Sequence, residues 1–225
     1  MKTVRTKAIV LRRTNYGEAN RILQLLTPEY GKLSVMAKGV RREKSKLASG
    51  IELFSRSDVT IATGKGEMGT LTGARSEVFY QKIVTEYDRL QFGYEALHQI
   101  TKAADMLDEP AFFELLDQCF EALNNLVIPL KLIKAWFWLQ LAVLLGQGLN
   151  LATDSNGMKL VEDARYEYDV NDQVFGFHEA GRFTSDHIKV LRLLSAQLPH
   201  VAQHVSGIEA LMDDCLWVAE RALAH

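Results

Sequence analysis

The chain has 225 residues, of which 48% are hydrophobic and 24% are charged, and its net charge is −2. This composition is typical of a soluble globular protein and excludes a disordered chain. The two cysteines, Cys119 and Cys215, are far apart in the sequence, which excludes a disulfide framework and suits a reducing cytosol. The first apolar run, residues 8–11, is too short for a signal peptide, so we expect a cytoplasmic protein.

The first 80 residues have the pattern of a small β domain. Alternation of apolar and polar residues and the intervening turns predict five strands. Pro28 and Gly31 mark one of the turns, with Pro where φ is near −65° and Gly where φ can be positive. Five strands in so short a segment favour a closed barrel, and the OB-fold is the leading candidate. The predicted strands are residues 3–13, 21–27, 32–38, 51–63 and 70–79.

From residue 81 onward the pattern becomes helical. Apolar residues recur at helical spacing, and Asp108 is expected to cap the helix that follows it. Residues 129–145 are strongly apolar but fall short of the about 20 residues that cross a bilayer, so we expect a buried helix. Residues 165–177 have the alternation of a β-hairpin. The apolar stripe of the first long helix consists of Leu90, Tyr94, Leu97, Ile100, Ala104 and Leu107.

These elements predict an α+β protein with two domains. The first, residues 1–80, is expected to be an OB-fold barrel. The second, residues 81–225, is a helical domain with a small β-hairpin insertion near residues 160–180.

The sequence offers no pattern of an enzyme. The segment from Gly39 to Ser45 ends in Lys-Ser but lacks the glycine that a phosphate-binding loop needs before the lysine. There is no serine-hydrolase or zinc-protease motif and no tight acidic cluster for two-metal chemistry. His200 and His204 share a spacing that suits a metal, but no third ligand accompanies them. We therefore expect a protein without catalytic residues, bound metal or cofactor.

The charges divide unevenly along the chain. Residues 1–82 hold sixteen Lys and Arg against seven Asp and Glu, whereas residues 83–225 hold ten against twenty-one. A cationic surface on the barrel would bind phosphates and release counterions, so its affinity should fall with salt. Few aromatic side chains accompany these charges, so we expect contacts to the nucleic-acid backbone rather than a stacking groove. The candidate contacts are Arg12, Arg13, Lys38, Arg41, Arg42, Lys44 and Lys46, with Arg21, Arg56 and Arg75 as weaker candidates.

The order and spacing of several short motifs in residues 3–80 resemble the RecO family of recombination mediators. The motifs are Gly17-Glu18, Leu26-Thr27, Gly31, Ala37-Lys38-Gly39, the basic pair Arg41-Arg42 and Gly69-Thr70-Leu71-Thr72. The resemblance implies an N-terminal OB-fold and a helical C-terminal domain. It also implies binding of single-stranded DNA, annealing of complementary strands, and action with RecR to load RecA onto strands coated by single-strand binding protein.

The chain departs from this family in its second half. Many members carry four zinc-binding cysteines there, and this segment has none at the corresponding place, so no zinc site is expected. The acidic balance of this half favours contacts with proteins over contacts with DNA. A partner tail that ends in acidic and apolar residues would need a cation beside an apolar groove. Candidates by residue type alone are Lys131, Lys134, Lys189 and Arg192.

Two other functions fit the charge distribution without the resemblance. One is an RNA-binding barrel protein of translation or ribosome assembly, and the other is a scaffold whose basic face meets an acidic protein. The charge alone does not choose DNA over RNA.

Overall fold

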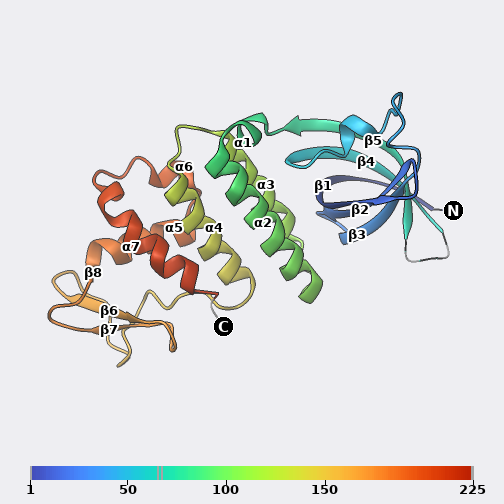
Figure 1. Cartoon of the computed structure of the whole chain (residues 1–225). Helices are drawn as coiled ribbons and strands as arrows, with labels where there is room; N and C mark the ends of the chain where they lie inside the picture. Colours follow the sequence, from blue (N-terminus) through green and yellow to red (C-terminus); the bar gives the residue numbers. More distant parts are fainter. Residues whose placement is uncertain (1, 65, 67, 224–225) are drawn as a thin grey trace. The chain divides into compact units, whose positions relative to one another are not determined.

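The computed structural model describes residues 2–64, 66 and 68–223. The chain forms two compact units, Met1–Asn124 and Asn125–His225. In the first unit the strands come first along the chain and helices follow them (Figure 1). Helices α1 (Gln81–Thr85), α2 (Tyr87–Met106) and α3 (Ala111–Asn124) belong to the first unit together with the strands that precede them. A boundary at residue 80, between the barrel and its helices, stays a prediction.

The first unit contains a closed five-stranded barrel, as expected for an OB-fold. Its strands lie in the order β1-β2-β3-β5-β4. Neighbouring strands are antiparallel except β3 and β5, which close the barrel in parallel through Val35 opposite Gly69 and Met36 opposite Thr70. The strands are β1 (Lys2–Tyr16), β2 (Asn20–Thr27), β3 (Gly31–Ala37), β4 (Ser55–Thr63) and β5 (Gly69–Phe79).

Strand β1 pairs with two neighbouring strands and bends between the two paired segments. Its first part, up to Ile9, pairs with β4, and its second part pairs with β2. A register shift between Val10 and Arg12 marks the bend. Such a bulge interrupts the alternation of sides, so four consecutive residues, 8–11, are buried and Arg12 is exposed.

Two sequence predictions about where an element begins need correction in this unit. Strand β4 starts at Ser55 rather than residue 51, because the chain turns before it and Phe54 has a left-handed φ of 57°. Asp108 does not cap α3; the Glu109 carboxylate accepts the hydrogen bond from the Ala111 N–H. Asp108 lies instead against Gly31, whose φ of 58° confirms the predicted turn glycine and whose missing β-carbon leaves room for the carboxylate.

Aromatic packing and an ion-pair network around Asp117 help to join the barrel to its helices. The buried Phe54 ring packs edge-on against Phe120 of α3, with the ring centroids 5.4 Å apart. The Asp117 carboxylate of α3 is buried, accepts a hydrogen bond from the Tyr80 hydroxyl at 2.6 Å and pairs with the Arg56 guanidinium of β4. Asp117 thus contacts two residues that are distant in sequence: Arg56 is 61 positions away and Tyr80 is 37 positions away.

The second unit packs helices around α4 (Leu130–Leu144), whose Trp136 and Phe137 side chains are buried. Within the described residues, no helix combines the length and the apolar character that a membrane span requires. Residues 165–177 form the predicted hairpin from β6 (Arg165–Asp169) and β7 (Val174–Phe177). A two-residue strand, β8 (Phe183–Thr184), adds a third member that the sequence did not reveal. The remaining helices are α5 (Ser185–Ala196), α6 (Pro199–Ala202) and α7 (Ile208–Arg221).

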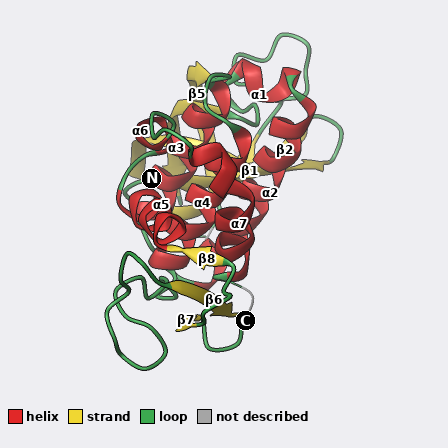
Figure 2. Ribbon diagram, turned by 90° about the vertical axis from the view of Figure 1, so that its left-hand side faces the viewer, coloured by secondary structure: helices red, strands yellow, loops and turns green. Residues whose placement is uncertain are grey.

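The small sheet lies beside the helices of this unit (Figure 2). Aromatic contacts attach the sheet to these helices. Phe175 and Phe183 pack with their centroids 5.5 Å apart, and Phe183 lies 6.2 Å from the Trp217 ring of α7. Arg182 and Arg221 both lie over the Trp217 ring, at 5.0 and 4.1 Å from its centroid. These cation–π and apolar contacts hold the small sheet against the helices.

His187 in this unit is expected to make stability depend on pH. The Thr184 N–H donates to His187 Nδ1 at 3.1 Å, and Nε2 lies 3.2 Å from an Asp214 carboxylate oxygen, so the neutral ring is satisfied on both sides. Burial lowers the pKa of His187 below its ordinary 6.5, although Asp214 opposes this. The unfolded chain therefore binds a proton at this histidine more tightly than the folded chain does. The contribution of neutral His187 to the free energy of unfolding is complete above its ordinary pKa and decreases as the pH falls below that value. The charge of Arg182 also lowers the pKa of His187, and the charge of Asp186 raises it.

The measurement is the change in melting temperature of this unit between about pH 5 and about pH 8. It should be larger in the wild type than in a His187→Gln variant, whose amide does not titrate. Equal changes in the two proteins would contradict the assignment.

Candidate nucleic-acid interface

The basic segment of residues 38–46 is anchored to the last residue of the turn after β1 and to the first residue of β2. The Arg41 N–H donates to the Ala19 carbonyl at 3.0 Å, and the Gly39 N–H donates to Asn20 Oδ1 at 2.8 Å. Val40 between them is buried in the barrel core. Two hydrogen bonds of backbone N–H groups and one buried side chain thus fix where this loop leaves the barrel. The cations of the loop are therefore held at one place on the barrel surface.

The structure brings five of the predicted contacts together on this loop. Lys38, Arg42, Lys44 and Lys46 are exposed, and so is Arg41, whose guanidinium donates to the Gly17 carbonyl at 3.2 Å. Concentrated and exposed positive charge is what a phosphate backbone requires. We name residues 38–46 the basic loop.

Arg21 lies close to the start of the basic loop. It is opposite Ala37 in the pairing of β2 with β3, directly before Lys38. Its Nε donates to Asn15 Oδ1 at 3.2 Å, which orients the side chain without neutralising its charge.

Arg12 and Arg13 differ although they are neighbours. Arg13 forms an ion pair with Glu52 at 2.7 Å, so its charge is partly compensated. Arg12 is exposed and lines a groove between β1 and α2. The sequence predicted both as equal members of one surface, whereas the structure gives them different surroundings.

Arg56 and Arg75 are both engaged by carboxylates. Burial works to lower the pKa of Arg56, but its hydrogen bond to Asp117 and the charge of Asp117 outweigh burial and raise it. Glu77 also pairs with Arg56, at 3.0 Å, which makes Arg56 the weakest member of the proposed contact set. Arg75 pairs with Asp58 at 2.7 Å, and this hydrogen bond raises the pKa of Arg75. Its backbone lies beside Gly50, shortly after the basic loop.

The apolar stripe expected for the first long helix included two exposed residues, Tyr94 and Leu107; Leu107 is 44% exposed and lies directly after the last residue of α2. Helical spacing put Tyr94 in the apolar stripe, but 51% of its surface is exposed. Tyr94, His98 and Lys102 are spaced four residues apart, which places them on one face of α2, and all three line the groove that Arg12 also lines. The four-residue spacing of one aromatic and two basic residues is the feature of the sequence that could have indicated this exposed face of α2.

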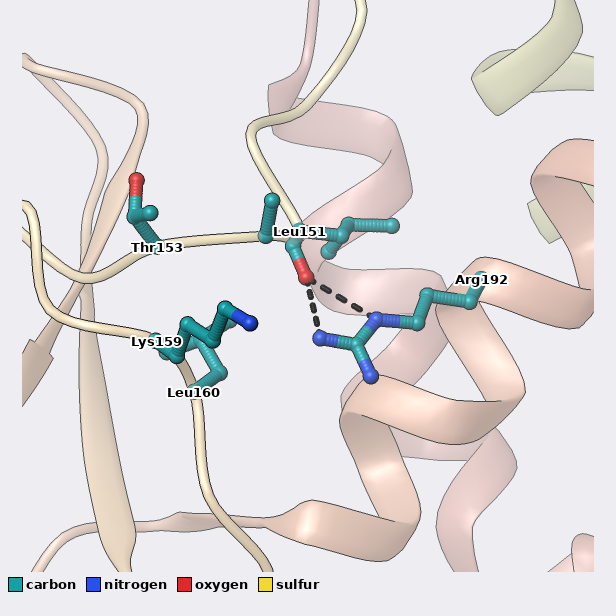
Figure 3. Close-up of a pocket in the computed structure, with 6 residues that line it drawn as sticks. Leu151, Thr153, Lys159, Leu160 and Arg192 are labelled. Atoms are coloured by element: carbon teal, nitrogen blue, oxygen red, sulfur yellow. Dashed lines mark hydrogen bonds between the residues drawn. The ribbon is translucent and has the colours of Figure 1, made fainter.

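The second unit contains a pocket of about 620 Å³, shown in Figure 3. The Arg192 guanidinium donates from Nε and Nη2 to the Leu151 carbonyl, at 2.9 and 2.5 Å. It thereby fixes the segment that faces Leu160 and Lys159 across the pocket. Of the other cations suggested for this half, Lys131 pairs with Asp213, and Lys189 pairs with Glu162 and Asp186.

The barrel order and its anchored basic loop define an OB-fold domain with a cationic surface. Residues 1–78 match the family model described as "Recombination protein O N terminal". Residues 1–78 of the chain are therefore similar to the N-terminal domain of the RecO family.

Proteins named DNA repair protein RecO are similar to this chain over longer segments. The protein of Dehalococcoides mccartyi strain 195 is 39% identical over 125 residues, which are 54% of this chain and 48% of the relative. That of Rubrobacter xylanophilus is 34% identical over 146 residues, 65% and 58% of the two chains. That of Bacillus cytotoxicus is 32% identical over 129 residues, 56% and 50%. The matched segments thus span about half the length of these relatives.

Proposed function

We propose that this protein is a DNA-repair and recombination mediator rather than an enzyme. It would bind single-stranded DNA through the barrel, promote annealing of complementary strands and help RecR to load RecA onto strands coated by single-strand binding protein. The match of residues 1–78 to the recombination protein O family and the names of the relatives support this proposal.

The observation that carries the proposal is the anchored basic loop. Arg41, Arg42, Lys44 and Lys46 are exposed on a segment that backbone hydrogen bonds hold against the barrel. Neutralising the phosphates of two strands at one surface would reduce their mutual repulsion, which favours annealing. Because the contact is to phosphates, we also expect binding of duplex DNA, with little preference for sequence.

The second unit is proposed to bind proteins. Its pocket combines the apolar side chains of Leu151 and Leu160 with the cation of Lys159 (Figure 3). Such a surface suits a tail of acidic and apolar residues, and RecR and single-strand binding protein are the proposed partners.

The decisive experiment measures annealing of complementary oligonucleotides coated with single-strand binding protein, with and without this chain and RecR. Faster annealing in the presence of the chain supports the proposal, and unchanged annealing contradicts it. Binding to single-stranded DNA, to RNA of the same sequence and to an acidic peptide, each over a salt series, separates the alternatives. Preference for RNA would favour the translation or ribosome-assembly protein, and preference for the peptide would favour the scaffold.

A further inference from the structure

A groove of about 390 Å³ lies inside the first unit, between β1 of the barrel and α2. Leu11 and Leu97, both buried, and Leu53 form its apolar lining. The volume is in the range of roughly 300–1,000 Å³ that is usual for small-ligand sites.

The groove contains an exposed aromatic ring that is held in place. Tyr94 packs edge-on against Phe54, with ring centroids 5.1 Å apart and planes at 77°. Phe54 is buried and packs in turn on Phe120. The Tyr94 ring therefore has a rigid support on one side while about half of its surface faces solvent. A fixed, exposed aromatic ring is a platform for stacking a planar group.

The charged residues of the groove favour an anion. Arg12 and Lys102 are exposed, and within the described part of the chain neither has a salt bridge or a side-chain hydrogen bond. The acidic residue of the lining, Asp105, is paired with Lys32 of β3. The lining thus presents two uncompensated cations beside the aromatic ring.

We propose that this groove binds one nucleotide of a single strand, with its base stacked on Tyr94 and its phosphates attracted by Arg12 and Lys102. This inference rests on the proposed binding of single-stranded DNA. An aromatic platform with neighbouring cations is how proteins bind single strands without reading their sequence. An acidic peptide would use the cations but would leave the platform without a matching planar group.

The position of the groove connects it to the basic loop. Strand β1 continues from Arg12 in the groove to Tyr16, directly before Gly17, whose carbonyl accepts the hydrogen bond of Arg41. Five residues of extended strand cover about 17 Å. A single strand that follows β1 would therefore meet the groove and the basic loop in succession.

The test compares Tyr94→Ala with the wild type on a fluorescent oligothymidylate and on an abasic oligomer of the same length. The variant should bind oligothymidylate about tenfold more weakly, as expected for one lost stacking contact, with an unchanged salt slope. Its affinity for the abasic oligomer should equal that of the wild type. Lys102→Ala should weaken both complexes and reduce the salt slope by about 0.7.

Two variants serve as matched controls. Tyr94→Phe keeps the ring, and Tyr87→Ala removes another exposed tyrosine of α2 that does not line the groove. Both should bind oligothymidylate as the wild type does. Photocrosslinking of wild-type protein to an oligonucleotide containing 5-iodouracil gives a second measurement that does not depend on the folding of a variant, and Tyr94 should be among the crosslinked residues.

The outcomes separate this inference from the proposed function. If Tyr94→Ala binds like the wild type, or if crosslinks form elsewhere and not at Tyr94, the groove is not a nucleotide site, while binding through the basic loop stands. If the wild type does not bind single-stranded DNA, both proposals fail.

Discussion

Replacing Asp117 with alanine is expected to lower the free energy of unfolding of the first unit by about 3 kcal/mol. The buried Asp117 carboxylate accepts the Tyr80 hydroxyl and pairs with Arg56, whose side chain is only 18% exposed. Without it, a largely buried guanidinium keeps only Glu77 and the more distant Glu121, and the Tyr80 hydroxyl loses its acceptor. Removing one partner of a buried pair costs much more than the pair itself contributes.

Urea unfolding followed by far-ultraviolet circular dichroism measures this loss. Glu121→Ala is the matched control, because Glu121 approaches the same Arg56 guanidinium at 3.6 Å but is 58% exposed, so the loss should be below about 1 kcal/mol. Hydrogen exchange should locate the effect in β4 and α3. A variant at Asp117 that is as stable as the wild type would show that these contacts do not hold the helices to the barrel.

The second large effect is expected from the basic loop. Replacing Arg41, Arg42, Lys44 and Lys46 together with alanine should lower affinity for single-stranded DNA on the order of a hundredfold near 0.15 M salt. The slope of log affinity against log salt should fall by about 2.8, since each lost phosphate contact on a single strand removes about 0.7. The loop should keep its place, because the Arg41 N–H and Gly39 N–H anchors belong to the backbone.

Fluorescence anisotropy over a salt series measures both quantities. The control variant changes the same amount of charge in the second unit, at Lys131, Lys134, Lys159 and Lys189, and it should retain the affinity and slope of the wild type. Loss of affinity in the control and not in the loop variant would move the DNA contact to the second unit.

The barrel could be predicted from the sequence because its signals are local. Alternation in residues 32–38 and the turn glycine Gly31 depend only on neighbours along the chain, and the structure confirms both. The burial of residues 8–11 does not follow from alternation, since it arises from the bulge near Arg12. The start of β4 was missed because the left-handed φ of Phe54 is fixed by packing against helices far along the chain.

The candidate site could be predicted only in part. Sequence charge identified the basic loop, since its cations lie close together along the chain and are exposed. Charge alone did not reveal that Arg56 faces Asp117, 61 residues away, or that Arg13 faces Glu52. Helical spacing predicted that Tyr94 is buried, but the residue is exposed. Spacing shows on which face of a helix a residue lies, but it does not show whether another element covers that face.

The packing of Trp217 under two arginines has a consequence for the fluorescence of the chain. All three tryptophans, Trp136, Trp138 and Trp217, belong to the second unit, whereas the barrel and its helices hold none. Indole emission therefore reports the second unit only, and for Trp217 it should respond to the nearby charges of Arg182 and Arg221. A partner that docks on the small sheet would change this emission, while DNA held by the barrel alone would leave it unaltered, so one spectrum can assign a ligand to its half of the molecule.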